Sequence, residues 1–310
     1  MTTEALRDKN DKNKKDGGGG TDNASDRGDG YEPSPRRLER ERHKRARARR
    51  ATGVAALSTV VTAVILYLVI TGSPGWQRTR ETFFSAKYAR IALPDVLKGL
   101  LLNLELLVIC GVCVLALGLL IAIARTLRGP VFFPLRALAV AYTDFFRGLP
   151  LIICLLISVF GIPALRLQGV TTNPVALGGF ALVLTYSAYV AEVFRAGIES
   201  VHPSQRAAAR SLGLSRAKTL RYVVLPQAIR RVVPPLLNDL VSLQKDTGLV
   251  SIGGAIDAVA AAQIIAGKDF NYTPYVIAGL IFVAVTIPMT RFTDWLTARM
   301  DGRRAQGGTV

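Results

Sequence analysis

Several apolar runs in the sequence are long enough to cross a lipid bilayer, and this feature constrains the fold more than any other. Residues 51–72 read ATGVAALSTVVTAVILYLVITG and carry no charge. The hydrocarbon core of a bilayer takes roughly 20 apolar residues as a helix, whereas the cores of soluble proteins show shorter, interrupted runs. Further apolar runs cover residues 99–124, 138–165, 175–190 and 274–289. The sequence therefore predicts an all-α polytopic membrane protein.

The distribution of basic residues predicts how these spans are oriented. The formal net charge is +17, and nine Lys or Arg against two Glu lie in residues 36–50, directly before the first span. Basic segments beside a span are typical of its cytoplasmic side. With this flank inside, six spans place the basic loop 195–231 and both chain termini in the cytoplasm, in a multi-pass protein of the cell (plasma) membrane. The basic segment 73–98 is the exception, because it falls outside.

The same pattern divides the chain into five segments. Residues 1–50 are expected to be a disordered, basic cytoplasmic arm, because the first part of the arm is rich in Gly, Asp, Asn and Lys and cannot bury apolar surface. Residues 51–72 form an extra N-terminal transmembrane helix, and residues 73–96 form an external or interfacial segment. The main transmembrane domain covers residues 97–296, and residues 297–310 form a cytoplasmic tail.

Few residues point to catalysis, a metal or a cofactor. Cys110, Cys113 and Cys154 fall inside apolar runs, which favours packing over metal or redox roles. The only histidines are His43 and His202, and no GxxxxGK[ST] phosphate loop occurs, so neither a His-based catalytic site nor ATP binding by that loop is expected. The basic arm has no interleaved aromatic residues, which favours membrane lipid over nucleic acid as its partner.

The loop of residues 203–226 has the pattern of two short helices. Pro203 suits the first position of a helix, which Gly213 can end in a left-handed cap. Ser215 is a natural N-cap for a second short helix, which is expected to end before Pro226. Such a loop is either an interfacial amphipathic hairpin on the inner leaflet or a docking element for another protein. Spacing alone favours the hairpin.

The residues of this loop also resemble the cytoplasmic loop motif of ABC importer permeases, E-A-A-x-x-x-G followed by I-x-L-P. The matching positions are Ala208-Ala209, Gly213 and Val223-x-Leu225-Pro226. Other stretches are similar to the polar amino-acid uptake branch of that family: FFRGLPL at 145–151, AYVAEVFRAGIESV at 188–201, LPQA at 225–228, Asn238, and LQKDTGLVS at 243–251. The similarity covers about residues 97–296 and leaves out the arm, the first span and the external segment.

The resemblance implies a type I ABC importer permease fold with about six transmembrane helices and a cytoplasmic coupling-helix loop. Such a subunit imports a polar amino acid and is not itself an enzyme. It binds no cofactor directly, because ATP and Mg²⁺ bind a separate cytoplasmic ABC ATPase dimer. The other implied partners are a second copy or a paralogous permease, and an external amino-acid-binding protein. The implied ATPase-coupling residues are Ala207, Ala208, Ala209, Leu212, Gly213, Leu214 and Pro226.

Three positions depart from the family pattern. Ala207 stands where the family has Glu, Gly248 where it usually has Ser, and Leu149 where it has Thr. The first change removes a carboxylate from the implied coupling surface, so we expect docking by shape to remain without a salt bridge at that position.

Ionisable residues near the spans are candidates for the translocation pathway, because charges within a membrane usually face a cavity or a partner. The run 232–266 is longer than one span needs, and Pro234-Pro235 and Gly253-Gly254 are expected to break or bend it. A broken helix exposes backbone groups that can bind a zwitterion. The pathway and substrate candidates are Asn238, Asp239, Lys245, Asp246, Asp144 and Arg147.

Structural alternatives remain open for each of these groups. Lys245 and Asp246 can pair with each other or cap a helix end, and Asp144 and Arg147 can belong to a packing turn at Pro150. Glu192 and Arg195 are expected to form a structural ion pair.

An alternative function is an ion- or proton-coupled secondary transporter that works without an ATPase. The loop centred on Gly213 distinguishes the two functions, because a self-contained transporter has no reason to carry it.

Overall fold

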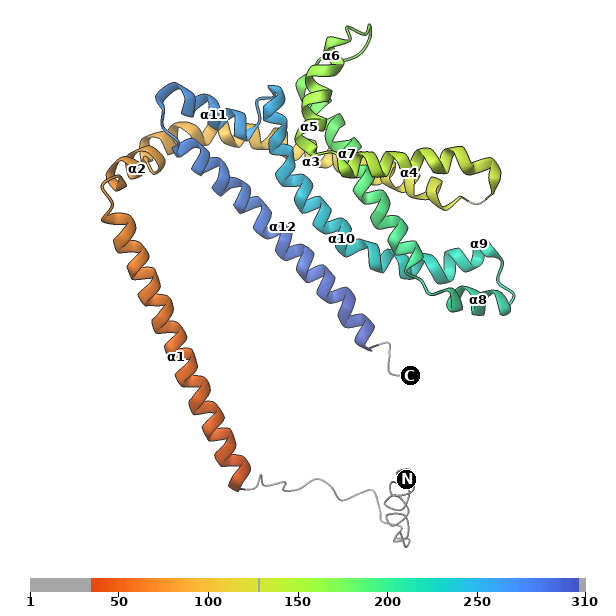
Figure 1. Ribbon diagram of the computed structural model, residues 1–310, viewed down its shortest axis with the longest axis horizontal. Coiled ribbons are helices and arrows are strands. Elements are labelled where there is room, and N and C mark those ends of the chain that lie inside the picture. Colours follow the sequence, from red (N-terminus) through yellow and green to blue (C-terminus); the bar gives the residue numbers. More distant parts are fainter. Residues whose placement is uncertain (1–34, 128, 307–310) are drawn as a thin grey trace, which may run out of the picture. The chain divides into compact units, whose positions relative to one another are not determined.

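The computed structural model describes residues 35–127 and 129–306 (Figure 1). The chain forms two compact units, Met1–Ser73 and Pro74–Val310. All regular structure within the described ranges is helical. In these two ranges, four helices are long and apolar enough to cross a membrane, and six spans result if each of two bent helix pairs counts as one. The all-α polytopic fold predicted from the sequence is confirmed.

The first unit contains one long helix, α1, Pro35–Thr71. Its apolar part, Ala51–Thr71, is a candidate span, as predicted. The expectation of disorder through residue 50 is wrong for residues 35–50, which continue the same helix towards the N-terminus. Arg, Lys, Glu, Leu and Ala dominate this stretch and all favour helix, and Pro35 suits its first turn. The expected disorder of residues 1–34 lies outside the described residues.

The second unit is a bundle of helices joined by short loops and turns (Figure 1). Its elements are α2 Trp76–Phe83, α3 Ala86–Thr126, η1 Pro130–Phe132, α4 Phe133–Gly148, α5 Leu151–Leu156, η2 Ile157–Gly161, α6 Ile162–Ala164, α7 Pro174–Glu199, α8 Pro203–Ser211, α9 Arg216–Thr219, η3 Leu220–Val224, α10 Leu225–Asp246, η4 Thr247–Gly253, α11 Ala258–Asp269 and α12 Thr273–Gln306. The last of these extends into residues 297–306, which were expected to be a tail.

Helix α3 begins well before the predicted domain boundary at residue 97. Residues 86–96, assigned from the sequence to an external segment, are its first three turns. Ala92 and Val96 are fully buried and pack with Ala258 and Ala262 of α11. Small side chains on both helices allow this close contact, so the segment belongs to the same unit as the rest of the bundle.

The main core lies between α3, α7 and α10. Leu106 and Cys110 of α3 pack with Leu182 and Tyr186 of α7, and Leu243 of α10 belongs to the same cluster. Burial of Cys110 fits the predicted packing role, and its thiol lies 3.6 Å from the carbonyl oxygen of Gly179. Cys154 is also buried, whereas Cys113 is exposed.

Two breaks bend the spans, and only some of the predicted breakers produce them. Helices α4 and α5 meet at 106° beside Pro150, and the run before α11 bends by 48° after Gly254, whose φ is +94°. Of the two outcomes expected for Pro234-Pro235, a break or a bend, the break does not occur, because α10 continues through both residues. Each proline removes one backbone hydrogen bond, but packing of α10 along α7 keeps the helix intact.

Candidate functional site

The predicted loop forms a helix, an elbow and a second helical segment. Helix α8 begins at Pro203 behind the His202 cap and ends at Ser211, two residues before Gly213, whose φ is +80°. The Gly213 N–H donates to the Arg210 carbonyl at 3.0 Å, and the Leu214 N–H donates to the Ala209 carbonyl at 3.2 Å. These two bonds form a Schellman cap, which requires the left-handed glycine. The predicted elbow is therefore confirmed.

The second helical segment continues further than the sequence indicated. Ser215 caps it as predicted, because its hydroxyl oxygen accepts a hydrogen bond from the Lys218 N–H at 3.3 Å. The prediction that this helix ends before Pro226 is wrong. A π-helical turn, η3, joins α9 directly to α10. Pro226 lies in the first turn of α10 and has no backbone N–H, so it cannot donate the helical hydrogen bond that another residue would make there.

The candidate coupling residues do not all face outward. Ala207, Ala208, Gly213 and Pro226 are exposed, Leu214 is half-buried and Ala209 is buried. Leu212 is 83% exposed, although it is a large apolar residue. Ala207 also lines a groove of about 740 Å³ between the loop and the ends of α3 and α7. The loop thus presents a small, partly apolar surface at its elbow.

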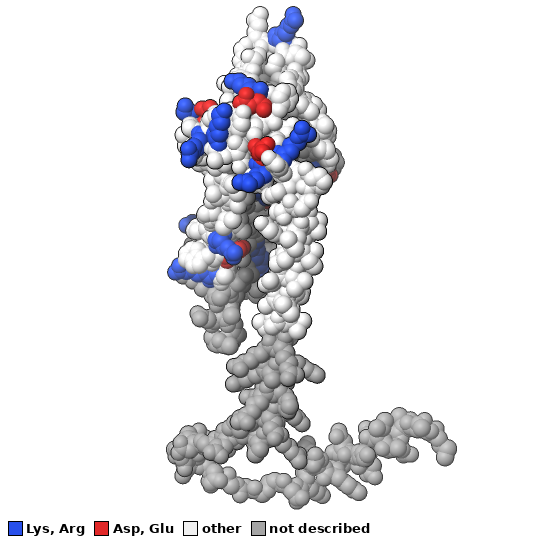
Figure 2. Space-filling model, turned by 90° about the vertical axis from the view of Figure 1, so that its left-hand side faces the viewer, with Lys and Arg blue, Asp and Glu red and all other residues white. Residues whose placement is uncertain are grey.

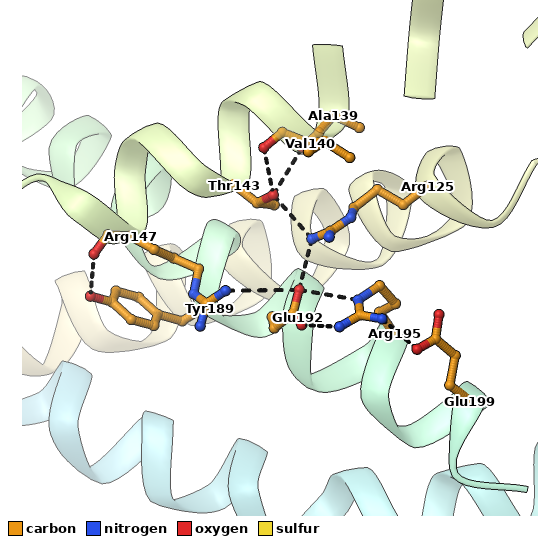
Figure 3. Close-up of polar contacts among 9 residues, drawn as sticks. All are labelled: Arg125, Ala139, Val140, Thr143, Arg147, Tyr189, Glu192, Arg195 and Glu199. Carbon is orange, nitrogen blue, oxygen red and sulfur yellow. Dashed lines mark hydrogen bonds and ion pairs between the residues drawn. The ribbon is translucent and has the colours of Figure 1, made fainter. Parts of the chain in front are cut away.

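Glu192 of α7 lies at the centre of a cluster of ion pairs that joins three helices (Figure 3). Its carboxylate accepts a hydrogen bond from Arg125 of α3 at 2.7 Å and from Arg195 one turn along α7. Arg125 also donates to the Thr143 hydroxyl of α4 at 3.0 Å, and Arg147 of α4 lies 3.9 Å from Glu192. The predicted Glu192–Arg195 ion pair is confirmed, and Arg147 lies at the edge of this cluster.

A polar cavity of about 440 Å³ lies where the α4–α5 break meets α7 and α10. Arg147, Asp239 and Asp246 line it, so three of the six pathway candidates come together. The Tyr186 hydroxyl donates to the Asp246 carboxylate at 2.6 Å. Asp239 Oδ2 is buried and has no hydrogen-bond partner in the described structure. The cavity therefore holds carboxylates and a guanidinium, with hydrogen-bonding capacity left unused.

The other three pathway candidates lie elsewhere. Asn238 and Asp144 are exposed and do not line the polar cavity. Lys245 borders a separate groove with Tyr275 and Phe282 of α12. Neighbouring residues on a helix point in different directions, so Lys245 and Asp246 do not share a site. No ion pair joins them in the described residues, where Asp246 bonds to Tyr186 instead.

Sequence reasoning missed the neutral polar residues of the cavity. Thr185, Tyr186 and Tyr189 of α7 line it, together with Ser242 of α10. The available signal was spacing, because residues 239, 242 and 246 lie on one helical face, as do 185 and 189. Since Thr185, Tyr186, Tyr189 and Ser242 carry no charge, only the fold singles them out.

Comparison with known proteins decides the family. Residues 130–302 match the model of a family described as the binding-protein-dependent transport system inner membrane component, which is more than half of the chain. The chain belongs to this family. The match includes the loop around Gly213 and the cavity residues, whereas α1, α2 and α3 precede it.

Individual relatives support the same assignment. The permease is 33% identical over 208 residues to the arginine transport system permease ArtQ of Bacillus subtilis, and the match covers 67% of the permease and 92% of ArtQ. It is 33% identical over 188 residues to the probable glutamine ABC transporter permease GlnM of the same organism, covering 60% and 83% of the two chains. A crystal structure of an amino acid ABC transporter with histidines superposes with a TM-score of 0.62 at 33% identity, covering 66% and 94%.

The permease therefore has the type I ABC importer fold, and ATP hydrolysis belongs to a separate ATPase subunit of such importers. It is not itself an enzyme, and the alternative of a secondary transporter is set aside. Gly248, where the family usually has Ser, lies in a tight site. A Cβ there would come within 3.1 Å of Phe282 and 3.2 Å of Val259, so a hydrogen fits where a side chain would crowd both neighbours.

Proposed function

We propose that the permease forms the membrane pathway of an ATP-driven importer of a polar amino acid. Its relatives are named for arginine and glutamine, so the common substrate class is a polar amino acid. The proposed partners are a cytoplasmic ABC ATPase dimer, an external amino-acid-binding protein, and a second permease copy or a paralogous permease. ATP and Mg²⁺ bind the ATPase, and the permease binds no cofactor directly.

The observation that carries this proposal is the elbow between α8 and α9. A Schellman cap holds Leu212 and Gly213 exposed at the elbow, next to exposed Ala207 and Ala208 of α8, and the loop is continuous with α10 through η3. Helix α10 in turn carries Asp239 and Asp246 to the polar cavity. A movement imposed on the elbow by an ATPase would thus act directly on the helix that lines the pathway. Ala209 contributes from inside the loop, where it is buried.

The cavity has the chemistry to hold a zwitterion. Arg147 can pair with an α-carboxylate, and Asp239 and Asp246 can accept hydrogen bonds from an α-ammonium group. Charged hydrogen bonds contribute about 1.5–3 kcal/mol each, so loss of one should be measurable as a change in transport. We therefore assign Arg147, Asp239 and Asp246 to the pathway, and leave Asn238, Asp144 and Lys245 outside it.

Neutralising the cavity carboxylates should slow transport without loosening the bundle. We expect Asp239→Asn or Asp246→Asn to reduce uptake about tenfold or more, because each removes a charged hydrogen-bond acceptor of about 1.5–3 kcal/mol. The measurement is uptake of labelled amino acids by vesicles containing the complete complex, with copurification of the ATPase as the test of assembly. Lys245→Gln is the matched control and should have a smaller effect, since Lys245 lies in a different groove. A larger effect of Lys245→Gln than of either Asp change would contradict the assignment.

The proposed orientation can be tested with reporter fusions. Because the basic loops favour the cytoplasmic side, fusions at Gly213 and after Val310 should both report inside. A fusion in the turn of residues 169–173, between α6 and α7, should report outside. An external signal at Gly213 would contradict the coupling role of the elbow, because a cytoplasmic ATPase could not reach it.

A further inference from the structure

Helix α2 and the first turns of α3 carry a group of basic side chains that the transport function does not use. They precede the family match at residues 130–302, so the family provides no role for them. Arg78 and Arg80 lie on α2, and Lys87 and Arg90 lie on α3. All four are exposed. We call these four residues the basic belt.

The chain itself holds the belt close to a membrane surface. The candidate span of α1 ends at Thr71, and α2 begins only five residues later at Trp76. Five residues span at most about 18 Å when fully extended, so α2 starts near the boundary of the bilayer. The Asn271 side-chain amide donates to the Glu81 carbonyl at 2.9 Å, and the Tyr272 N–H donates to the Thr82 carbonyl at 2.8 Å. These bonds fix the end of α2 to the turn between α11 and α12.

The positive charge of the belt is not neutralised within the described chain. No ion pair among the described residues involves any of its four members. Glu81 and Asp95, which lie on the same two helices, have other contacts, because Glu81 accepts a hydrogen bond from Gln77 at 3.2 Å and Asp95 lies 4.0 Å from Lys98. Figure 2 shows the face of the molecule that includes this region, with basic side chains gathered around few acidic ones. The belt is therefore free to bind anions.

Aromatic side chains lie among the basic ones. Phe84 is 61% exposed, and Phe83 is partly exposed beside the ring of Tyr272, 5.3 Å away. The ammonium group of Lys87 lies 5.6 Å from the ring centre of Tyr88. Aromatic rings at the membrane–water boundary together with exposed Lys and Arg are typical of segments that lie in the headgroup layer. Together with the short link to the candidate span of α1, these rings favour the headgroup layer as the binding partner.

We propose that the basic belt, with Phe83 and Phe84, binds the headgroups of anionic phospholipids at the membrane surface. The guanidinium and ammonium groups pair with lipid phosphates, while the two rings enter the boundary of the acyl chains. The predicted orientation places residues 73–98 outside, although basic segments are typical of the cytoplasmic side. Binding to anionic lipid explains why this external segment is basic. It anchors the start of α3 beside its contact with α11.

Fluorescence of Trp76 can test this binding in the complete permease. The chain has two tryptophans, so Trp295→Phe leaves Trp76 of α2 as the only reporter. The protein is placed in vesicles of phosphatidylcholine and phosphatidylglycerol, with bromine on the acyl chains of one lipid or the other as the quencher. We expect brominated phosphatidylglycerol to quench about threefold more than brominated phosphatidylcholine, since each basic residue near a surface attracts anionic lipid. The difference should shrink in high salt, which screens exposed charges.

Charge variants in the same background make the test specific. Arg78→Gln, Arg80→Gln, Lys87→Gln and Arg90→Gln combined should equalise quenching by the two lipids. Glu81→Gln with Asp95→Asn is the control in the opposite direction and should increase the preference for the anionic lipid. Equal quenching in the parent, in protein that elutes and unfolds normally, would overturn the proposal. If quenching is equal and the four-residue variant instead loses stimulation of ATP hydrolysis by the binding protein, the belt is a protein-docking surface.

Discussion

Replacing Leu212 with aspartate should abolish ATP-driven uptake while the permease still folds and inserts. Leu212 is 83% exposed at the elbow, so the substitution disturbs no internal packing. Burial of a leucine side chain against a partner contributes about 1.5–3 kcal/mol, and an unpaired carboxylate in an apolar contact costs several kcal/mol more. The affinity for the ATPase should therefore fall more than a hundredfold, at about 1.4 kcal/mol for each factor of ten. Copurification of the ATPase and its hydrolysis rate in vesicles measure this loss.

Two further variants separate the contributions of charge and backbone at the elbow. Ala207→Glu restores the residue that the family has at an exposed position, so it should be tolerated or strengthen docking. Gly213→Leu should weaken docking to a lesser degree than Leu212→Asp. Residue 213 has a left-handed backbone conformation, which costs about 1 kcal/mol for a residue with a side chain. No atom lies within 4 Å of the added Cβ, so no clash adds to this cost. Normal copurification of the Leu212→Asp variant would show that the elbow is not where the ATPase binds.

Adding a single methyl group at Gly99 should destabilise the helix bundle severely. The Cβ of Gly99→Ala would lie 2.3 Å from the Asp257 carbonyl carbon and 2.4 Å from the Ala258 nitrogen. Both are backbone atoms at the start of α11, so the two helices must move apart. Overpacking of this kind typically costs about 1–3 kcal/mol, before any hydrogen bonds are lost.

The movement would also break a buried polar network between α3 and α11. The Asn103 side chain donates to the Asp257 carboxylate at 3.0 Å and accepts from the Ala258 N–H at 3.1 Å. Asp257 is fully buried and also accepts from the N–H groups of Val259 and Ala260. Buried polar groups that lose their partners cost about 1–3 kcal/mol each, so the total loss should exceed about 3 kcal/mol.

The measurement is thermal unfolding of the purified permease in detergent. Gly279→Ala is the matched control, because a Cβ at this position of α12 meets nothing within 4 Å. Its stability should be unchanged or slightly higher, since alanine favours a helix over glycine by about 0.5–1 kcal/mol. Equal transition temperatures for the Gly99 and Gly279 variants would mean that α3 and α11 are not in close contact in the membrane.

Local sequence patterns predicted the parts of this protein that depend on neighbouring residues alone. Mostly apolar runs long enough for a bilayer identified the spans, because backbone groups in lipid must bond within their own helix. Gly213 and Ser215 identified the elbow, because a left-handed residue ends a helix and an N-cap begins one through hydrogen bonds to residues close in sequence. The order of motifs along the chain then indicated the family, which the comparisons confirm.

The tertiary structure alone decided which charges share a site. Arg147 of α4 meets Asp239 and Asp246 of α10 in one cavity, whereas Lys245, next to Asp246 in sequence, lies in another groove. Packing also kept α10 helical through Pro234-Pro235 and buried Ala92 and Val96 in the first turns of α3. A charged residue in a predicted span is expected to face a partner or a cavity, but the sequence does not say which partner or which cavity. That choice depends on which helix faces meet, a property of contacts between residues far apart in the chain.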